Sequence, residues 1–232
     1  AGLAAGAVVA YALPAVTTFG PGRSRLLPRL SGLGDPGHVA LTFDDGPDPL
    51  STPRFLDVLD RLGVRATFFV LGEMLVRAPS LGAELAAEGH EVAVHGWDHR
   101  SLLLRTPRST YEGMRRARDL VDGVCGGRPR WFRPPYGVLS AAALVAAGRL
   151  GLRPVLWSAW GEDWTVAATP GSVLDTLAPD LRGGATLLLH DSDCTSSPGA
   201  WRSALGALPE LVDRCRARGV RVGPLAEHGL PP

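Results

Sequence analysis

Hydrophobic and polar positions divide this chain into two kinds of segment. Short apolar runs without helical spacing, such as residues 38–43 and 65–71, are typical of strands that are buried on both faces. Longer segments carry apolar residues at helical spacing. Residues 55–62 are one example, which follows a Ser-Thr-Pro start signal and ends at Gly63. The pattern therefore predicts strands and helices in alternation.

The alternation continues to the end of the chain, with short connections throughout. We expect further strands at residues 91–95, 131–133, 154–157, 185–190 and 220–222, and further helices at residues 75–88, 108–122, 140–150, 171–182 and 199–218. Such alternation is typical of a parallel sheet covered by helices. Because the unit recurs about seven times, we predict an α/β fold built as a distorted (β/α) barrel of about seven strands rather than a doubly wound sheet.

Composition and charge narrow the choice of function. The chain has 232 residues, 45% of them hydrophobic and 20% charged, which is typical of a folded globular protein. The net charge is +1, so there is no basic surplus for nucleic acid, and no nucleic-acid partner is expected. All 24 basic residues are Arg, which we attribute to codon bias. None of the three cysteines lies in a Cys-x-x-Cys pair, which disfavours a thiolate zinc site and leaves one disulfide open.

Residues 1–37 form an apolar lead rich in Pro and Gly, ahead of the domain that we assign to residues 38–232. Residues 1–22 carry no charge, and the apolar stretch before Pro14 is too short to span a bilayer alone. Two interpretations stay open: the remnant of a signal or membrane-anchor helix, or an apolar leader packed on the domain. We expect the first, and hence a protein outside the cytoplasm, either secreted or attached to the membrane at the cell surface through its N-terminus. We separately expect a monomer.

Polar residues that can do chemistry follow the predicted strands. In parallel α/β folds, active sites lie at the carboxyl ends of the strands. The groups that follow the strands are Asp44-Asp45, His95 to His99, Arg133 to Gly137, Glu162 to Trp164, and His190-Asp191. The sequence therefore predicts a functional site at this end of the sheet.

His95 and His99 are four residues apart, so both imidazoles can reach one ion. That spacing alone is weak, because surface histidines share it. A carboxylate from a neighbouring strand end makes the set two nitrogens and one oxygen, which leaves positions open for water and substrate, as in a catalytic metal site.

A metal would also explain two adjacent aspartates after a buried strand. Asp44 and Asp45 repel each other, and a cation offsets that repulsion. One carboxylate can bind the cation while the other, held ionised beside it, acts as a general base. The alternative is an ordinary Asp-Asp-Gly-Pro turn at the surface.

Five short motifs resemble, in order, those of the polysaccharide deacetylases, carbohydrate esterase family four with the NodB-homology fold: TFDDGP at 42–47, His95-x-x-x-His99, RPPYG at 133–137, EDW at 162–164 and LLHD at 188–191. The resemblance implies a metal-dependent hydrolase that removes N-acetyl groups from glycans containing N-acetylglucosamine, such as peptidoglycan or chitin-like polymers. Zinc is the metal we expect, and cobalt or nickel would also suit the ligands.

The resemblance also implies roles for individual residues. Asp44 is expected to be the general base, with Arg133 orienting it and keeping it ionised. His190 is expected to be the general acid, with Asp163 orienting it and stabilising its charge. Amide hydrolysis needs such a pair, because water must lose a proton and the leaving amine must gain one.

The remaining implied roles concern the metal and the substrate. The expected metal ligands are Asp45, His95 and His99. Tyr136 is expected to offer its backbone N–H to the developing oxyanion, with Pro134 beside it in the substrate site. Trp164 and Leu189 are expected to form the walls of a small pocket for the acetyl methyl group.

Two positions depart from the family pattern. Trp160 occupies a position where the family usually carries Asp, and Gly96 one where it carries Ser or Thr. We expect Trp160 to belong to the core, although it could instead stack on a sugar or alter the surroundings of Arg133. Two other functions stay open: a deacetylase or esterase acting on a small acetylated molecule or acetyl xylan, and a glycan-binding domain without activity.

Overall fold

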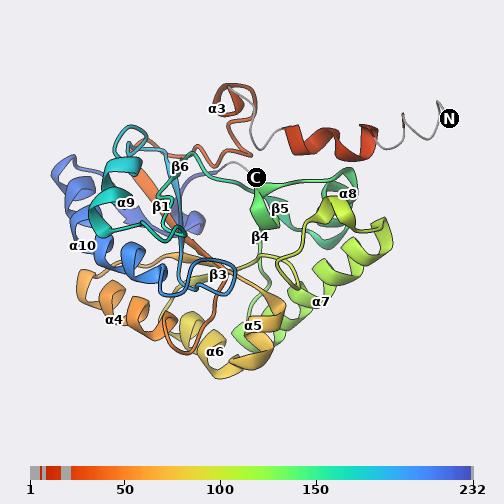
Figure 1. Cartoon of the computed structure of the whole chain (residues 1–232), viewed down its shortest axis with the longest axis horizontal. Coiled ribbons are helices and arrows are strands. Elements are labelled where there is room, and N and C mark those ends of the chain that lie inside the picture. The colour runs from red at the N-terminus through yellow and green to blue at the C-terminus, as the bar shows by residue number, and fades with distance from the viewer. Residues whose placement is uncertain (1–5, 7–8, 17–21, 231–232) are drawn as a thin grey trace.

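One parallel sheet forms the centre of the molecule, and helices pack around its outer face (Figure 1). The computed structural model describes residues 6, 9–16 and 22–230. The strands are β1 (His38–Asp44), β2 (Thr67–Val70), β3 (Glu91–Val94), β4 (Trp131–Phe132), β5 (Arg153–Pro154), β6 (Ala159–Trp160), β7 (Thr186–His190) and β8 (Arg221–Gly223). They follow the order β5-β4-β3-β2-β1-β7-β6, and β8 pairs with β1.

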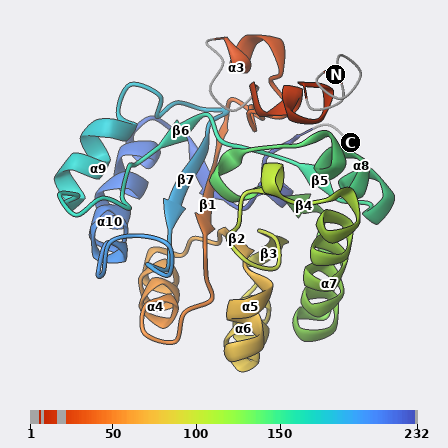
Figure 2. The same ribbon diagram turned by 45° about the vertical axis from the view of Figure 1, so that its right-hand side comes forward.

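The helices surround the sheet on three sides, as Figures 1 and 2 show. They are α3 (Arg23–Leu26), α4 (Thr52–Leu62), α5 (Gly72–Arg77), α6 (Pro79–Ala87), α7 (Pro107–Cys125), α8 (Ala141–Leu150), α9 (Pro170–Leu177) and α10 (Trp201–Ala217), with short 3-10 turns η1 (Leu13–Ala15), η2 (Leu102–Leu104), η3 (Pro135–Gly137) and η4 (Leu225–Glu227). The sheet is curled, and in the described chain its end strands β5 and β6 are not paired with each other. The predicted α/β class and distorted barrel are confirmed.

Both faces of the sheet carry buried apolar side chains, and the residues on the two faces belong to different clusters. On β1, Phe43 points outward and packs against Phe55 of α4 and Phe68 of β2, with ring centroids 5.0 and 5.1 Å away. Thr42 and Asp44, its neighbours along the strand, therefore face the inside of the curled sheet, because side chains alternate along a strand. This alternation places the carboxylate at the strand end inside the half-barrel.

Two predicted elements differ in the structure. The single helix predicted over residues 75–88 is two helices, α5 and α6, because Pro79 lacks an N–H and Ala78 before it adopts φ −135° and ψ 61°. Of the strand predicted over residues 154–157, only Pro154 lies in a strand, at the end of β5. The next strand, β6, begins at Ala159. Between them, the Leu156 N–H donates to the Leu30 carbonyl of the lead rather than to the sheet, at 2.7 Å.

The lead lies over the open side of the half-barrel (Figure 1). Besides the Leu30 contact, the Gly34 N–H donates to the Gly184 carbonyl at 3.0 Å, and Ser31 is fully buried. Residues 30–34 therefore pack as part of the domain, ahead of the boundary predicted at residue 38. In the described part of the chain, no helix has both the length and the apolar character to cross a bilayer. The signal or anchor prediction depends largely on residues 1–5, 7–8 and 17–21, which lie outside the described residues.

Histidines outside the predicted site are buried. His38 begins β1, at the end of the strand opposite to the predicted site, and its Nδ1 lies 2.9 Å from Nδ1 of His228. His90 lies directly before β3. It is buried beside Phe68, and its Nδ1 accepts a hydrogen bond from the Ala66 N–H at 3.1 Å. The three cysteines are all free, so the disulfide left open by the sequence does not form.

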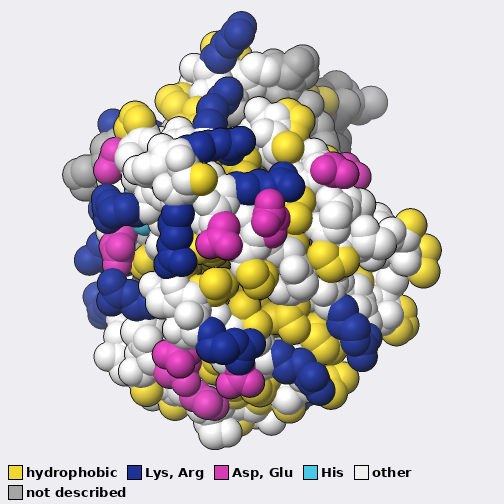
Figure 3. Space-filling model, turned by 90° about the vertical axis from the view of Figure 1, so that its left-hand side faces the viewer, with side chains coloured by type: hydrophobic (Ala, Val, Ile, Leu, Met, Phe, Trp, Pro, Cys, Tyr) yellow, Lys and Arg dark blue, Asp and Glu magenta, His cyan; other side chains and the backbone are white. Residues whose placement is uncertain are grey.

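Charged side chains of both signs are mixed with apolar ones on the face that Figure 3 shows, over the side of α9 and α10. This view agrees with the net charge of +1 and shows no extended basic surface on that face. The chemistry of the molecule is concentrated inside the half-barrel.

The close contact between the lead and the turn before β7 can be tested with two glycines. A Cβ on Gly183 would lie 1.6 Å from the Pro36 carbonyl oxygen, so Gly183→Ala should lower the free energy of unfolding by about 3 kcal/mol. Gly123, inside α7, has nothing within 4 Å of its Cβ position, so Gly123→Ala should raise it by about 0.5–1 kcal/mol. Urea denaturation measures both. Equal small effects would show that the lead does not pack there.

Candidate functional site

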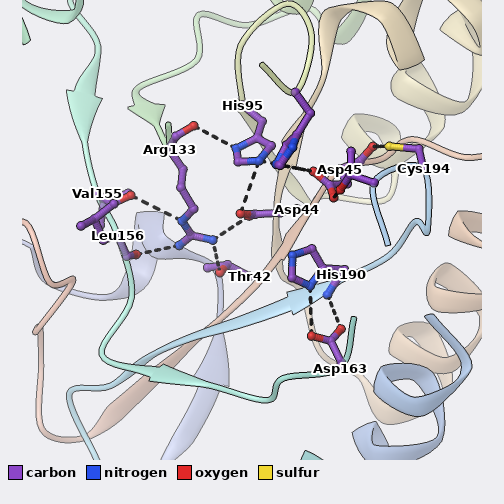
Figure 4. Close-up of polar contacts among 12 residues, drawn as sticks. Thr42, Asp44, Asp45, His95, Arg133, Val155, Leu156, Asp163, His190 and Cys194 are labelled. Carbon is purple, nitrogen blue, oxygen red and sulfur yellow. Dashed lines mark hydrogen bonds and ion pairs between the residues drawn. The ribbon is translucent and has the colours of Figure 1, made fainter. Parts of the chain in front are cut away.

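A cavity of about 310 Å³ lies at the carboxyl ends of the strands, where the sequence places its polar residues. It is lined by Asp44, His95, His99, Tyr136, Gly137, Trp157, Trp160, Trp164, Leu188, His190, Thr195 and Ser196. Figure 4 shows how side chains from β1, β3, β4 and β7 converge there. Most of the predicted site residues are therefore brought together, although they come from positions far apart in the chain.

Asp45, His95 and His99 form a set that fits a metal ion. Oδ1 of Asp45 lies 3.3 Å from Nε2 of His95 and 3.5 Å from Nε2 of His99. Oδ1 is buried and has no hydrogen-bond partner among the described residues, which is costly unless a cation binds there. Asp45 also adopts φ 81°, a strained conformation for a residue other than Gly. Two imidazole nitrogens and one carboxylate oxygen suit zinc, cobalt or nickel.

Both histidines are held ready to bind a cation. Nδ1 of His95 lies 2.9 Å from the Arg133 carbonyl oxygen; it must donate there, which leaves the lone pair of Nε2 facing Asp45. The ring of His99 packs edge-on against Tyr136, with centroids 4.3 Å apart. Burial, together with the neighbouring His95, lowers the pKa of His99 to about 4, so its imidazole is neutral at neutral pH.

Asp45 is ionised although it is buried. Burial raises the pKa of its carboxyl, but the nearby imidazole of His95 and the positive charge of His190 outweigh burial and bring the pKa well below its usual range. A carboxylate and two neutral imidazoles are the protonation states that a divalent cation requires. The residues present therefore fit the implied metal.

Thr195 supports Asp45 and was not found from the sequence. Its hydroxyl donates to Oδ2 of Asp45 at 2.5 Å, which leaves Oδ1 free to face the histidines. The neighbouring Cys194 donates its S–H to the Asp45 carbonyl at 3.5 Å. Burial and the charge of Asp45 raise the pKa of Cys194 to about 12, so this thiol is not a nucleophile.

Arg133 is fully buried and fixes Asp44. Its Nη1 donates to Oδ1 of Asp44 and to the Thr42 hydroxyl, both at 2.7 Å, and its Nη2 donates to the Leu156 carbonyl at 2.8 Å (Figure 4). The other oxygen of Asp44, Oδ2, lies 3.8 Å from Nε2 of His95 and so faces the candidate metal ligands. One oxygen of Asp44 is thus held by the guanidinium of Arg133, and the other is directed toward the cavity.

Asp163 binds His190 through both of its oxygens. Oδ2 accepts the His190 backbone N–H at 2.7 Å, and Oδ1 lies 3.0 Å from Nδ1 of the ring. Burial opposes charge on the imidazole, but the carboxylate of Asp163, followed by those of Asp45 and Asp44, outweighs burial and raises the pKa of His190 to about 10. His190 is therefore an imidazolium at neutral pH.

The prediction that Leu189 forms the acetyl pocket is wrong. Leu189 pairs in register with Phe43, is fully buried and packs on the helix side of the sheet, close to Gly161. Leu188 pairs with Thr42 and lines the cavity instead. A shift of one residue along a strand reverses the face, and the run of three leucines concealed which of them faces inward.

Other predicted substrate residues lie at different depths. Tyr136 and Trp164 line the cavity as expected, and Tyr136 adopts φ 60°, which turns its backbone in the RPPYG loop. Pro134 is buried before η3 and does not line the cavity, so the expectation of a direct substrate contact is not supported.

The prediction that Trp160 belongs to the core is also wrong. Its side chain is 37% exposed and lines the cavity, because β6 is an end strand and pairs Trp160 with the inward-facing Leu188. In place of an acid at position 160, the carbonyls of Val155 and Leu156 accept hydrogen bonds from Nε and Nη2 of Arg133.

Asp191, which directly follows β7, has a structural role. It is buried, its carboxyl hydrogen-bonds with the Thr52 hydroxyl, and its carbonyl accepts from the Ser51 hydroxyl at 2.6 Å. Burial raises the pKa of Asp191 to about 7. These contacts join the end of β7 to the start of α4.

Comparison with known proteins finds a family match and similar proteins. The family model described as polysaccharide deacetylase matches residues 32–155. The chitooligosaccharide deacetylase of Bradyrhizobium sp. (strain ANU 289) is 35% identical over 199 residues, which cover 82% of this chain and 89% of that protein. The crystal structure of a peptidoglycan N-acetylglucosamine deacetylase has a TM-score of 0.80 at 28% identity, covering 88% of this chain and 92% of that one.

The fold is also shared with an inactive relative. A CE4 family pseudoenzyme from Bacillus anthracis has a TM-score of 0.75 at 22% identity, covering 84% of this chain and 66% of that one. Fold alone therefore does not establish activity, and the function of this chain must be argued from its site.

The contact from Thr195 to Asp45 predicts a change in metal affinity. Thr195→Val removes the donor that orients the carboxylate, so zinc or cobalt should bind about tenfold more weakly. Competition with a chromophoric chelator measures this directly. Ser196→Ala, beside it in the cavity, is the control and should bind metal as the parent does. Unchanged affinity in Thr195→Val would show that Asp45 is oriented without it.

The pair of His190 and Asp163 predicts a pH dependence in the metal-free protein. Because the pKa of His190 is raised from 6.5 to about 10, its stabilising contribution is fully present below pH 6.5 and is lost as the pH rises through 10. In Asp163→Asn the partner charge is gone, so the pKa should fall to 6.5 or below. Proton NMR of the imidazole in both proteins tests this. A parent His190 that titrates near 6.5 would contradict it.

Proposed function

The chain belongs to the polysaccharide deacetylase family, and from this premise we propose that it hydrolyses N-acetyl groups of glycans that contain N-acetylglucosamine, such as peptidoglycan or chitin-like oligomers. The observation that carries the proposal is that one cavity contains both a proton acceptor and a proton donor, each held by a partner of opposite charge. Asp44 is held as a carboxylate by Arg133, and His190 is held as an imidazolium by Asp163. Hydrolysis of an amide needs one of each.

Asp44 acts as the general base. Arg133 occupies its Oδ1, so Oδ2 is the atom that accepts a proton from the attacking water. The low-dielectric surroundings of both residues strengthen the ion pair that fixes this geometry. A divalent cation bound by Asp45, His95 and His99 would polarise the acetamide carbonyl and lower the pKa of the attacking water.

His190 acts as the general acid. The nitrogen of an amide is a poor leaving group until it is protonated, and the imidazolium of His190 lines the same cavity as Asp44. Asp163 uses both oxygens to fix the ring and the backbone of His190, which keeps the proton donor in one orientation. The carboxylate also stabilises the charge that the ring carries before transfer.

The walls of the cavity position the acetyl group. The backbone N–H of Tyr136 is our candidate donor to the oxyanion, because the strained turn at this residue brings the RPPYG backbone to the cavity. Leu188 and Trp164 are the apolar walls for the methyl group, with Leu188 replacing the Leu189 of the sequence prediction. Zinc is the metal we propose, with cobalt and nickel as alternatives that the same ligands accept.

The proposed substrate class also indicates where in the cell the protein acts. We propose that the protein acts outside the cytoplasm on cell-surface or extracellular glycans, in agreement with the apolar sequence of residues 1–22. Membrane attachment through that segment and a monomeric state remain predictions. Nucleic acid is not a proposed partner, because the net charge is only +1.

The test is acetate release from N-acetylglucosamine oligomers by zinc-loaded protein. Asp44→Asn should lower kcat about 10³-fold while zinc still binds, because the base is lost and the ligands remain. Asp175→Asn, exposed on α9, is the matched control and should be fully active. A chelator should abolish turnover, and zinc or cobalt should restore it.

Two outcomes would overturn the proposal. Zinc-loaded parent that released no acetate from chitin oligomers or peptidoglycan would exclude glycan N-deacetylation. Release from small acetyl esters or acetyl xylan alone would favour the second function left open by the sequence.

A further inference from the structure

We propose that Trp160, together with Trp157 and Trp164, forms a platform on which a neighbouring sugar ring stacks, so that this chain selects oligomeric glycans over single acetylated sugars. The inference rests on the proposed function and specifies the substrate class of the same site. It assigns a purpose to the residue that departs most clearly from the family pattern.

Four aromatic rings, from His190 to Trp157, follow one another along one wall of the cavity. The Trp164 ring lies edge-on to His190, with centroids 5.5 Å apart at 79°. The Trp160 ring follows at 5.2 Å from Trp164, and the Trp157 ring is stacked on Trp160 at 6.0 Å and 21°. A substrate whose acetamide group lies beside His190 would extend its next ring along this row.

Trp160 is the exposed member of the row. Its side chain is 37% exposed, whereas Trp157 is 9% exposed, and the tryptophans outside the cavity at 131 and 201 are buried in the core. A large indole left open to water inside a cavity indicates a binding surface rather than packing. The pairing of Trp160 with Leu188 fixes the orientation of this indole toward the cavity.

The lead holds the base of the platform in place. Arg23, from the lead, donates through Nη2 to the Trp157 carbonyl, and its guanidinium carbon lies 5.7 Å from the Trp157 ring. Trp157 is in turn stacked on Trp160. Side chains already held in place lose little entropy on binding, so most of the stacking energy contributes to affinity.

The chemistry of this end of the cavity fits a neutral sugar. The ionisable residues lining the cavity, Asp44, His95, His99, Tyr136 and His190, are all accounted for at the reacting end. A pyranose ring carries polarised C–H groups on its face and hydroxyls at its edge. The negative face of an indole attracts such C–H groups, and water remains available to the hydroxyls at an open surface.

The experiment compares N-acetylglucosamine with its β-linked tetramer in zinc-loaded protein. In Trp160→Ala, the ratio of the two kcat/KM values should shift about three- to tenfold against the tetramer, through KM. Trp160→Phe should recover most of that loss, because it keeps an aromatic face. Val166→Ala, in the loop that contains Trp164, is 90% exposed and outside the cavity, so it should match the parent.

Calorimetry separates this inference from the proposed function. The tetramer is titrated into Asp44→Asn protein with and without Trp160→Ala, so that binding is measured without turnover. Weaker binding in the double variant supports the platform even if the parent releases no acetate, in which case only the proposed function fails. Equal tetramer binding in the two proteins, or equal losses for monosaccharide and tetramer in Trp160→Ala, would overturn the inference.

Discussion

A buried guanidinium, that of Arg133, is the group on which the rest of the site depends. Two adjacent carboxylates lie at the end of β1 with almost no exposure to water, and such an arrangement is unfavourable without positive charge nearby. Arg133 compensates Asp44 directly, while its own carbonyl orients His95 toward Asp45. Its Nε and Nη2 also donate to the carbonyls of Val155 and Leu156. One residue thereby joins the candidate base, a candidate metal ligand and the wall between β5 and β6.

The sequence predicted most of this centre because the relevant residues immediately follow strands. Asp44 and His190, for example, end parallel strands that pair in register, and the fold brings their side chains to one cavity. Prediction failed where a single register step or an irregular loop decides the position. Leu188 and Leu189 are chemically identical and differ only in the face they occupy. Thr195 lies 150 positions beyond Asp45, in a loop without a periodic signal, so its contact could be found only in three dimensions.

The edge position of β6 explains why the prediction for Trp160 was wrong. A tryptophan in a short strand is usually taken as core, but β6 ends the sheet and has a neighbour on one side only. The break between α5 and α6 has a different cause, because Pro79 is a helix start signal that can be recognised in the sequence itself. The two cases differ for related chains. A helix start at a proline can be recognised from the local sequence, whereas the exposure of a residue on an edge strand depends on which other segments pack against it.

The contact between Leu30 and Leu156 ties the lead to the segment that carries Trp157, one wall of the cavity. A protein that began at residue 38 would keep every motif yet leave the buried Leu156 N–H without its acceptor, at a cost of about 1–3 kcal/mol. It would also lose Arg23 and its hold on Trp157. Domain limits drawn from motifs alone would therefore yield a protein that keeps the residues of the candidate site but has a loosened cavity wall at Trp157, and a defect of that wall would be mistaken for a defect of the site.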